Sequence, residues 1–471
     1  MSFVWNTQKI AEILNLPLSG PNQSITGITT DSRKVLKGSL FIAIKGDVHD
    51  GHSFIPQVIE AGAAAVISET AVSIPNGSQA QIFQVLSSLD AIRKLAHFYR
   101  KQFTIPVIGV VGAVGKTTTK ELIASLFEGR YTSVLKTEGS ENGFLGIPIT
   151  LLKMKPDTQV AVIEIGIDEI GAMTQHLDIV EPTHVILTKN GPEHLHQLKT
   201  VEIAAEEELK AFDHALAHKI PMAINLSDEY VFNWFQKNRS KLDPKNYLTY
   251  SLNRNDRPRN LGTWSAEQSL LTVELNEAGK ITEETFPTPL PGEHHAHNLL
   301  AAISLVHFFK LTSSELTQGL STFKTAYGRT EIYHLDGGVD VIGDHYNSNP
   351  TSLLAAISLL TSKKGAPHYH AALGDMLELG DKEEQFHREM APSIVKSGVT
   401  HVWLYGPRMK WLDDELKKLH FANVRHFDTH EALTQTLKAS LGNRDQVLVK
   451  GSRGMKMEKV LKSLLGQEVK H

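Results

Sequence analysis

The stretch Ile108-Gly-Val-Val-Gly-Ala-Val-Gly-Lys116-Thr117-Thr118-Thr119 joins an apolar run to two glycines, a lysine and three threonines. The run Val107–Val111 predicts a buried strand, and Gly112 and Gly115 predict a tight turn that aims backbone N–H groups inward. An amphipathic helix should follow, with Leu122, Ile123, Leu126 and Phe127 on one face. Because a helix N-terminus favours phosphate, this order predicts binding of a nucleoside triphosphate.

Two side chains strengthen this prediction. Lys116 supplies positive charge for the β- and γ-phosphate oxygens, and the Thr117 hydroxyl stands where such loops ligate Mg²⁺. Val110 occupies the position of the first glycine in the general phosphate-loop pattern. The loop is therefore the shorter G-x-x-G-K-T form, which points away from typical GTPases and motor ATPases. The alternative interpretation is a glycine turn before a helix whose lysine is solvated.

The composition is that of an ordinary globular protein. The 471 residues are too many for one core and predict two or three domains. Apolar residues make up 41% and charged residues 21%, and the net charge of −4 gives no reason to expect nucleic acid or membrane as a partner. Cysteine is absent, which excludes disulfides and thiolate chemistry. With no signal-like N-terminus or membrane-spanning apolar run, we expect a cytoplasmic enzyme.

The pattern of strands and helices predicts an α/β protein with three domains. A small N-terminal α/β domain should cover residues 1–85, with strands at 39–44 and 63–68 and helices at 7–14 and 54–61. A central domain of phosphate-loop ATPase type, with a mostly parallel sheet, should cover 86–326. Its expected elements are a helix at 89–103, strands at 159–165 and 184–188, an antiparallel excursion around 270–275 and a helix at 298–309.

The C-terminal residues 327–471 predict a Rossmann-like, doubly wound sheet with strands at 339–342, 370–373, 401–405 and 446–449. Ligands of such sheets bind outside the carboxyl ends of strands, where Asp344 and Lys450 should lie. The polar loop Tyr346–Pro350 opens a helix and suits hydrogen bonding to an uncharged or zwitterionic ligand. The run Lys450–Lys456 is either a second anion site or an ordinary solvated loop.

Glu164 and His194 are candidates for the chemistry of the central domain. Glu164 ends a strand about one βαβ unit after the phosphate loop, where a carboxylate is the usual second anchor for Mg²⁺. Its alternative is a solvated residue at a strand end. His194 follows the next strand near the same edge of the sheet, although a single histidine is more often structural.

Two clusters are interpreted as lacking chemistry. His294, His295 and His297 lack i, i+4 spacing, and Pro291-Gly292 predicts a loop there, so we assign them no zinc. Glu206, Glu207 and Glu208 form an acidic run on a predicted helix, and we interpret Glu207 and Glu208 as a solvated face.

Several longer strings together resemble the Mur ligase family, and the resemblance runs nearly end to end. They are Thr30-Asp-Ser-Arg33, Asp50-Gly-His-Ser-Phe54, Gly115-Lys-Thr-Thr-Thr-Lys-Glu121, Gly328-Arg329, Asp344-x-Tyr-Asn-x-Asn-Pro350, Leu373-Gly-Asp-Met-Leu-Glu-Leu-Gly380 and Val449-Lys-Gly-Ser-Arg-Gly-Met-Lys-Met-Glu458. The last two of these strings resemble most specifically the branch of the family that adds D-alanyl-D-alanine. The resemblance implies that ATP phosphorylates the terminal carboxylate of UDP-N-acetylmuramoyl-tripeptide. The dipeptide amine would then attack the acyl phosphate, in a step of peptidoglycan precursor synthesis.

The resemblance also implies roles for particular residues. Catalysis would rest on Lys116, Glu164, His194 and Arg329. ATP would contact Gly112, Gly115, Lys116, Thr117, Thr118, Asn298 (facing the adenine), Arg329 and Asp344. Mg²⁺ would be held by Thr117, Glu164, His194 and Glu206. The substrates would contact Ser32, Arg33 and His52 at the UDP end, Asn142, and the dipeptide loop residues Tyr346, Asn347 and Asn349. The family favours a monomer.

Three departures from the family pattern matter. Ala113 and Val114 replace a polar pair in the phosphate loop, although the backbone donors should survive. Lys189 stands where asparagine is usual and could compete with metal. Glu206 aligns with a lysine that many relatives carbamylate, and we expect it to supply a carboxylate directly. The alternatives are a sister ligase that adds a single amino acid and a nucleotide-binding scaffold with a decayed site. The third residue of the tripeptide, diaminopimelate or lysine, stays open.

Overall fold

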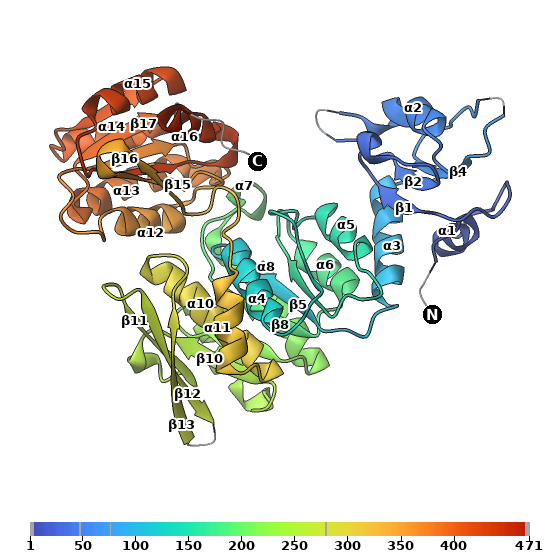
Figure 1. The fold of residues 1–471 in the computed structure, drawn as a ribbon, viewed down its shortest axis with the longest axis horizontal. Coiled ribbons are helices and arrows are strands. Elements are labelled where there is room, and N and C mark those ends of the chain that lie inside the picture. Colours follow the sequence, from blue (N-terminus) through green and yellow to red (C-terminus); the bar gives the residue numbers. More distant parts are fainter. Residues whose placement is uncertain (1–3, 47–48, 76, 278–279, 467–471) are drawn as a thin grey trace. The chain divides into compact units, whose positions relative to one another are not determined.

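The structure is a computed structural model that describes residues 4–46, 49–75, 77–277 and 280–466. Its strands form three sheets of four, nine and six strands (Figure 1). The chain folds into two compact units. The first contains residues 1–109, 132–165 and 174–183, and the second contains 110–131, 166–173 and 184–471. The predicted α/β class with three sheet domains is confirmed, whereas the expected boundaries at 85/86 and 326/327 stay predictions.

The four-stranded sheet is parallel throughout. Its order is β1 (Gly27–Thr29), β2 (Ser39–Ile42), β3 (Ala65–Ser68) and β4 (Gln81–Gln84). Helices α1 (Thr7–Leu14) and α3 (Ser88–Arg100) bury apolar side chains against one face, and α2 (Ile55–Glu60) covers the other. The two strands and two helices expected for this domain are therefore confirmed, as is the helix expected at 89–103 in the central domain, each within three residues at either end; that third helix packs on the four-stranded sheet instead.

The nine-stranded sheet has the order β13-β12-β11-β10-β9-β8-β5-β7-β6. Its strands are β5 (Val107–Val111), β6 (Val134–Lys136), β7 (Val160–Glu164), β8 (His184–Leu187), β9 (Met222–Asn225), β10 (Tyr247–Ser251), β11 (Asn260–Ser265), β12 (Leu270–Glu277) and β13 (Lys280–Pro287). The pairs β6–β7, β8–β9, β9–β10 and β10–β11 are parallel. β12 pairs antiparallel with both β11 and β13, which confirms the predicted excursion at the edge.

Helix α4 (Lys116–Glu128) follows the glycine loop, and its first residue is the predicted phosphate-binding lysine. The expected helix is confirmed, but every residue from Lys116 to Phe127 is buried, so its expected amphipathic character is wrong. α4 packs against α10 (Glu293–Val306) and α11 (Ser313–Ser321), and the Ser125 hydroxyl donates to Gly319 O at 2.5 Å. A helix covered on all sides has no solvent face to which polar residues could be assigned.

Helix α10 begins at Glu293, five residues before the predicted start at Asn298. Gly292, with φ of +106°, stands at its N-cap and ends the preceding turn. His294, His295 and His297 therefore lie in the first turns of a helix, and the prediction that they lie in a loop is wrong. The other helices around this sheet are α5 (Gly146–Leu152), α6 (Ala172–Val180), α7 (Leu195–Leu198), α8 (Val201–His218) and α9 (Glu229–Asn238).

The C-terminal six-stranded sheet has the order β14-β15-β19-β16-β17-β18, with β14 antiparallel to the rest. Its strands are β14 (Glu331–Leu335), β15 (Val339–Asp344), β16 (Tyr369–Gly374), β17 (His401–Tyr405), β18 (Val424–Phe427) and β19 (Gln446–Lys450). Helices α12 (Pro350–Leu360) and α13 (Glu383–Ser397) cover one face, and α15 (His430–Ser440) and α16 (Glu458–Leu465) cover the other (Figure 1). Helix α14 (Met409–Lys418) packs on the α13 side. Among the described residues, no helix is both long and apolar enough to span a bilayer.

Candidate active site

The phosphate loop joins β5 to α4 and requires glycine at two positions. Gly112 has φ of +117°, and a Cβ there would lie 2.4 Å from Thr188 Oγ1. Gly115 has φ of +89°, and its Cβ would lie 2.7 Å from Asn298 Oδ1. Both positions combine a left-handed backbone with a close neighbour, so any side chain would disturb the loop. The same contact places Asn298 of α10 against the loop, whereas its expected role at the adenine stays a prediction.

Three N–H groups of the loop have partners within the protein. Gly112 N–H donates to the Glu208 carboxylate at 2.7 Å. The N–H groups of Ala113 and Val114 both donate to Lys189 O, at 2.8 and 3.0 Å. These three N–H groups donate to other protein atoms, so the expectation that they point toward a bound phosphate is wrong. The phosphate-binding donors of this loop are therefore expected at the start of α4, where the first N–H groups of a helix lack an intrahelical carbonyl.

Lys116 is held by a carboxylate that we did not single out from the sequence. Its ammonium lies 2.9 Å from Glu193 Oε2, and both side chains are largely buried. Lys116, Thr117 and Thr118 are themselves 5–8% exposed. A buried ammonium requires a negative partner, and Glu193 fills that need in this structure. An incoming phosphate would replace one anion with another at Lys116.

The acidic run on α8 is arranged differently from our prediction. Glu206 is exposed, whereas Glu207 and Glu208 are 2% and 1% exposed, so the interpretation of these two as a solvated face is wrong. Glu207 accepts hydrogen bonds from Gly171 N–H and Met173 N–H, both at 3.0 Å. Residues two apart on a helix differ by about 200° around its axis. The carboxylate at the phosphate loop is consequently Glu208 and not Glu206.

Glu208 has the most strongly perturbed carboxyl group near the loop. One oxygen accepts the Gly112 N–H, and the other has no hydrogen-bond partner among the described residues. Burial raises the pKa of Glu208 to about 7, against the opposing charge of Lys116. A buried carboxylate with an unused oxygen is poised to accept a cation or a proton.

Glu164 lies in the first compact unit, at the end of β7, and is 1% exposed. Its Oε1 accepts a hydrogen bond from the Asn142 amide at 2.7 Å, and its N–H donates to Thr137 Oγ1 at 3.0 Å. The structure thus joins two residues to which the sequence analysis gave separate roles, in metal and in substrate binding. Both roles stay predictions.

His194 lies between β8 and α7, with φ of +49°. Its Nδ1 is 2.6 Å from Glu378 Oε2, and its Nε2 is 3.8 Å from Glu193 Oε1. His194 and Lys116 are therefore linked through Glu193, whereas their expected roles in catalysis stay predictions. Within the described part of the chain, no cluster of three or more histidine, aspartate or glutamate side chains is arranged to hold a metal ion.

The C-terminal candidates gather at the carboxyl ends of β15 and β19. Asp344 is 2.6 Å from Lys450 Nζ and accepts the Thr330 N–H at 3.3 Å. Burial opposes the charge of Asp344, but Lys450 outweighs it and holds the pKa of Asp344 below its usual value. The Arg329 guanidinium lies 4.8 Å from the centre of the Tyr346 ring, and Arg453 lies 5.3 Å from it. Tyr346 and two cations therefore form one cluster.

The loop predicted to bind the dipeptide also makes hydrogen bonds that stabilise the fold. The Asn347 carbonyl accepts from Lys450 Nζ at 2.9 Å. Asn349 caps α12: its Oδ1 accepts the Ser352 N–H at 2.8 Å, and the Ser352 hydroxyl accepts the Asn349 N–H. This capping box occupies the side-chain oxygen of Asn349, which leaves the amide NH₂ of the same side chain for a ligand.

The residues expected at the UDP end lie in two short turns of the first unit. Ser32 and Arg33 form a 3₁₀ turn, in which Arg33 pairs with Asp31 at 2.9 Å and remains 86% exposed. His52 Nε2 accepts the Glu69 N–H at 3.0 Å, so the ring proton on Nδ1 faces Asp50 at 2.6 Å. Both His52 nitrogens are engaged, and a ligand would find Arg33 the more available contact.

Comparison with known proteins gives the class of this protein. Three family models match: the Mur ligase family catalytic domain at residues 24–115, the Mur ligase middle domain at 110–306, and the Mur ligase glutamate ligase domain at 328–453. The chain belongs to the Mur ligase family. The UDP-N-acetylmuramoyl-tripeptide–D-alanyl-D-alanine ligase of Bacillus subtilis is 34% identical over 97% of this chain and 98% of its own length. The enzyme of the same name from Synechocystis is 32% identical over 94% and 92%.

Solved structures support the fold. MurF from Acinetobacter baumannii superposes with a TM-score of 0.86 at 23% identity, covering 99% of this chain and 100% of that one. MurF from Thermotoga maritima, in complex with ADP, gives a TM-score of 0.78 at 24% identity, covering 94% and 97%. At such identities the likeness concerns the three-domain fold alone.

Sequence reasoning missed Glu193, Glu208 and Glu378. Glu378 lies inside the string Leu373–Gly380, and Glu193 directly precedes His194. Their partners are distant in sequence, so no local pattern pointed to the contacts. Glu208 did have a signal, because it is four residues after Ala204 and three before Ala211, on the buried stripe of α8.

Proposed function

We propose that this chain is an ATP-dependent amide ligase that joins D-alanyl-D-alanine to UDP-N-acetylmuramoyl-tripeptide. The observation that carries this proposal is the glycine-dependent loop with Lys116 at the start of α4, in a chain matched almost end to end by relatives with that activity. The substrates and nucleotide would be available in the cytoplasm. The monomeric state remains a prediction.

The chemistry requires ATP because a carboxylate does not condense with an amine when the leaving group would be oxide. A carboxylate oxygen attacks the γ-phosphorus, the bond to ADP breaks, and an acyl phosphate forms. The dipeptide amine then attacks the carbonyl carbon, loses a proton, and phosphate leaves with the electron pair. Lys116, released from Glu193, would pair with the transferring phosphoryl group and stabilise its negative charge.

The residues beside the loop fit Mg²⁺, which prefers oxygen ligands. The unpartnered, buried Glu208 oxygen and the Thr117 hydroxyl belong to the same unit, with His194 nearby. We propose that Glu208, in place of Glu206, provides the direct carboxylate. When bound, Mg²⁺ would neutralise charge on the phosphates. Glu164 belongs to the other unit, and its part in metal binding stays a prediction.

The test is phosphate release from ATP with UDP-N-acetylmuramoyl-tripeptide, measured with and without D-alanyl-D-alanine. Tripeptides ending in diaminopimelate and in lysine are both used, because the sequence leaves the third residue open. We expect release to rise strongly when the dipeptide is added and to couple to peptide product. Stimulation by a single amino acid instead would show a sister ligase. No stimulation by any acceptor would show a nucleotide-binding protein without ligase activity.

A further inference from the structure

A loop of the C-terminal sheet contacts the segment that carries His194. The loop follows β16, and its Glu378 side chain lies 2.6 Å from His194 Nδ1. The Glu378 carbonyl also accepts the Leu195 N–H at 2.8 Å. One residue of the C-terminal sheet domain therefore contacts both the side chain of His194 and the first turn of α7.

The backbone on both sides of this contact is strained. Glu378 has φ of +63° and His194 has φ of +49°. Lys199, which ends α7, has φ of +69° and ψ of −56°, and the next N–H, that of Thr200, reaches back to Leu198 O at 2.8 Å. Such conformations are unfavourable for residues other than glycine and persist where surrounding contacts enforce them. The contact is one such enforcing element for the four-residue helix α7.

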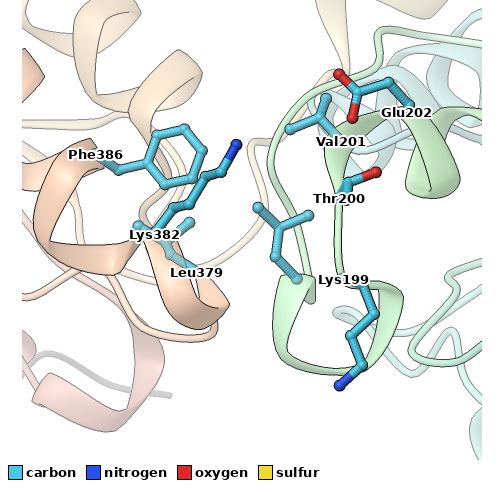
Figure 2. A pocket seen from close by; sticks show the side chains of 8 residues that line it. Lys199, Thr200, Val201, Glu202, Leu379, Lys382 and Phe386 are labelled. Atoms are coloured by element: carbon cyan, nitrogen blue, oxygen red, sulfur yellow. The ribbon is translucent and has the colours of Figure 1, made fainter.

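Gly380 allows the two segments to approach. Its φ is +64°, and a Cβ at this position would lie 2.8 Å from Leu195 O. Figure 2 shows the cavity beside this contact, with Leu379, Lys382 and Phe386 on the C-terminal side and residues 199–202 opposite. A methyl group at residue 380 would therefore push the loop away from α7.

The contact continues inward to the phosphate loop. His194 uses Nδ1 toward Glu378, and its Nε2 is 3.8 Å from Glu193, whose carboxylate holds Lys116 at 2.9 Å. Glu378, His194, Glu193 and Lys116 thus form a row of alternating acidic and basic side chains. This row leads from the C-terminal sheet domain to the start of α4.

We infer that Glu378 is a positioning residue that couples docking of the C-terminal loop on α7 to the orientation of His194 at the nucleotide site. The inference rests on the proposed function in one respect, that His194 faces the metal–nucleotide complex. A carboxylate that accepts one ring N–H of a histidine fixes which nitrogen faces the ligand, and losing it typically costs 10–100-fold in metal affinity. Docking of the C-terminal loop on α7 would in this way orient the His194 ring toward the metal–nucleotide complex.

Two variants separate the side chain from the docking contact. Glu378→Gln keeps the shape and the backbone bond to Leu195 but removes the charge facing His194. Gly380→Ala keeps Glu378 but obstructs the approach to Leu195. Gly398→Ala is the matched control, because Gly398 is also left-handed, with φ of +88°, and has no atom within 4 Å of its Cβ position.

The first readout is the equilibrium affinity of the protein for Mn²⁺ in the presence of ADP, monitored by the Mn²⁺ resonance signal. The second readout is hydrogen exchange of the Leu195 amide. We expect Glu378→Gln to weaken Mn²⁺ binding about 10-fold or more while the Leu195 amide stays protected. Gly380→Ala should lower both the Mn²⁺ affinity and the protection of the Leu195 amide, whereas Gly398→Ala should lower neither. Wild-type affinity in Glu378→Gln, or equal effects of the two glycine variants, would overturn the inference. Neither readout needs the peptide substrates, so a failure of ligation rejects the proposed function alone.

Discussion

At the scale of single residues, the Glu208 carboxyl group is the best target near the phosphate loop. Its oxygen that accepts the Gly112 N–H can be replaced by an amide oxygen, so Glu208→Gln should preserve the loop while removing the charge. We expect the Mg²⁺ concentration for half-maximal ligation to rise about 10–100-fold. The measurement is initial rate against Mg²⁺ concentration at pH 8, above the Glu208 pKa of about 7.

The matched control for this prediction is Glu206→Gln, which removes the same charge from the exposed side of α8. It should leave the Mg²⁺ dependence at the wild-type value. If Glu206→Gln shifts the curve and Glu208→Gln does not, the assignment of the carboxylate to Glu208 is wrong.

The second prediction at the scale of single residues concerns Lys116. Removing one preorganised charge from a phosphoryl-transfer site typically costs about 10²–10³-fold in rate. Lys116→Ala should therefore lower the ligation rate at saturating ATP by that factor, whereas Lys237→Ala, at an exposed lysine of α9, should not. Full activity of Lys116→Ala in a product-formation assay would remove the phosphate-loop lysine from the mechanism.

The sequence predicted these residues with unequal success. Lys116 and Thr117 follow from a local pattern of glycines and a helix start, so their placement at the start of α4 was predictable. The choice between Glu206 and Glu208 depends on helix phase: Glu206 is exposed and Glu208 lies on the buried stripe of α8, which alignment with relatives does not report. The partnership of Lys116 with Glu193 depends on how strands and loops assemble, which no local pattern reports.

At the scale of secondary-structure elements, the N-terminus of α12 contains Asn349, a residue that we expected to bind substrate. The Asn349 side chain caps this helix, and loss of an N-cap costs about 0.5–2 kcal/mol. Asn349→Ala should therefore lower the apparent unfolding temperature, whereas Asn349→Ser, which can still cap, should restore most of it. Thermal unfolding of both variants is the measurement.

The kinetics of Asn349→Ser separate capping from binding. If the Asn349 amide also contacts the dipeptide, the KM for D-alanyl-D-alanine rises in the serine variant although stability is retained. An unchanged KM in both variants would limit Asn349 to the helix cap.

The predicted ends of helices agree with the structure where the capping residues could be recognised in the sequence. The start and end of α1 agree with the prediction because Asn6 caps the helix and Asn15 ends it in the left-handed region. The start of α10 was missed because Gly292 was interpreted as part of a loop, whereas it is the N-cap of the helix. The burial of α4 was missed because coverage by α10 and α11 comes from residues more than 160 positions later.

At the scale of the whole molecule, buried histidines predict how stability depends on pH. Burial lowers the pKa of His176, His184, His294, His297 and His370 to about 4 in each case. In the unfolded chain histidine titrates near 6.5. Between pH 6.5 and pH 4 the unfolded chain therefore binds more protons, so stability is complete above this window and is lost as the pH falls through it.

The loss should be about 2 kcal/mol for each such histidine at pH 5. Apparent unfolding temperatures at a fixed scan rate should therefore fall steeply from pH 7 to pH 5. His184→Gln should make the decline shallower, and His218→Gln, at an exposed position of α8, should not. A flat profile over this range would show that these rings are protonated without cost in the folded protein.

The three-domain organisation was predictable from the sequence because each domain has its own alternation of strands and helices. What the sequence could not provide is the contact between distant strings, such as His194 with Glu378, separated by 184 positions. Such contacts arise only when the C-terminal sheet domain and α7 are folded together. The proposed positioning role of Glu378 depends on this contact.

Amide ligation through an acyl phosphate can be tested by following the oxygen of the substrate carboxylate. UDP-N-acetylmuramoyl-tripeptide labelled with ¹⁸O in its terminal carboxylate is incubated with the protein, ATP, Mg²⁺ and D-alanyl-D-alanine, and the released phosphate is analysed by mass. We expect one ¹⁸O atom in each phosphate formed, because the carboxylate oxygen that attacks the γ-phosphorus leaves with it. Phosphate without the label, formed alongside the peptide product, would contradict this expectation.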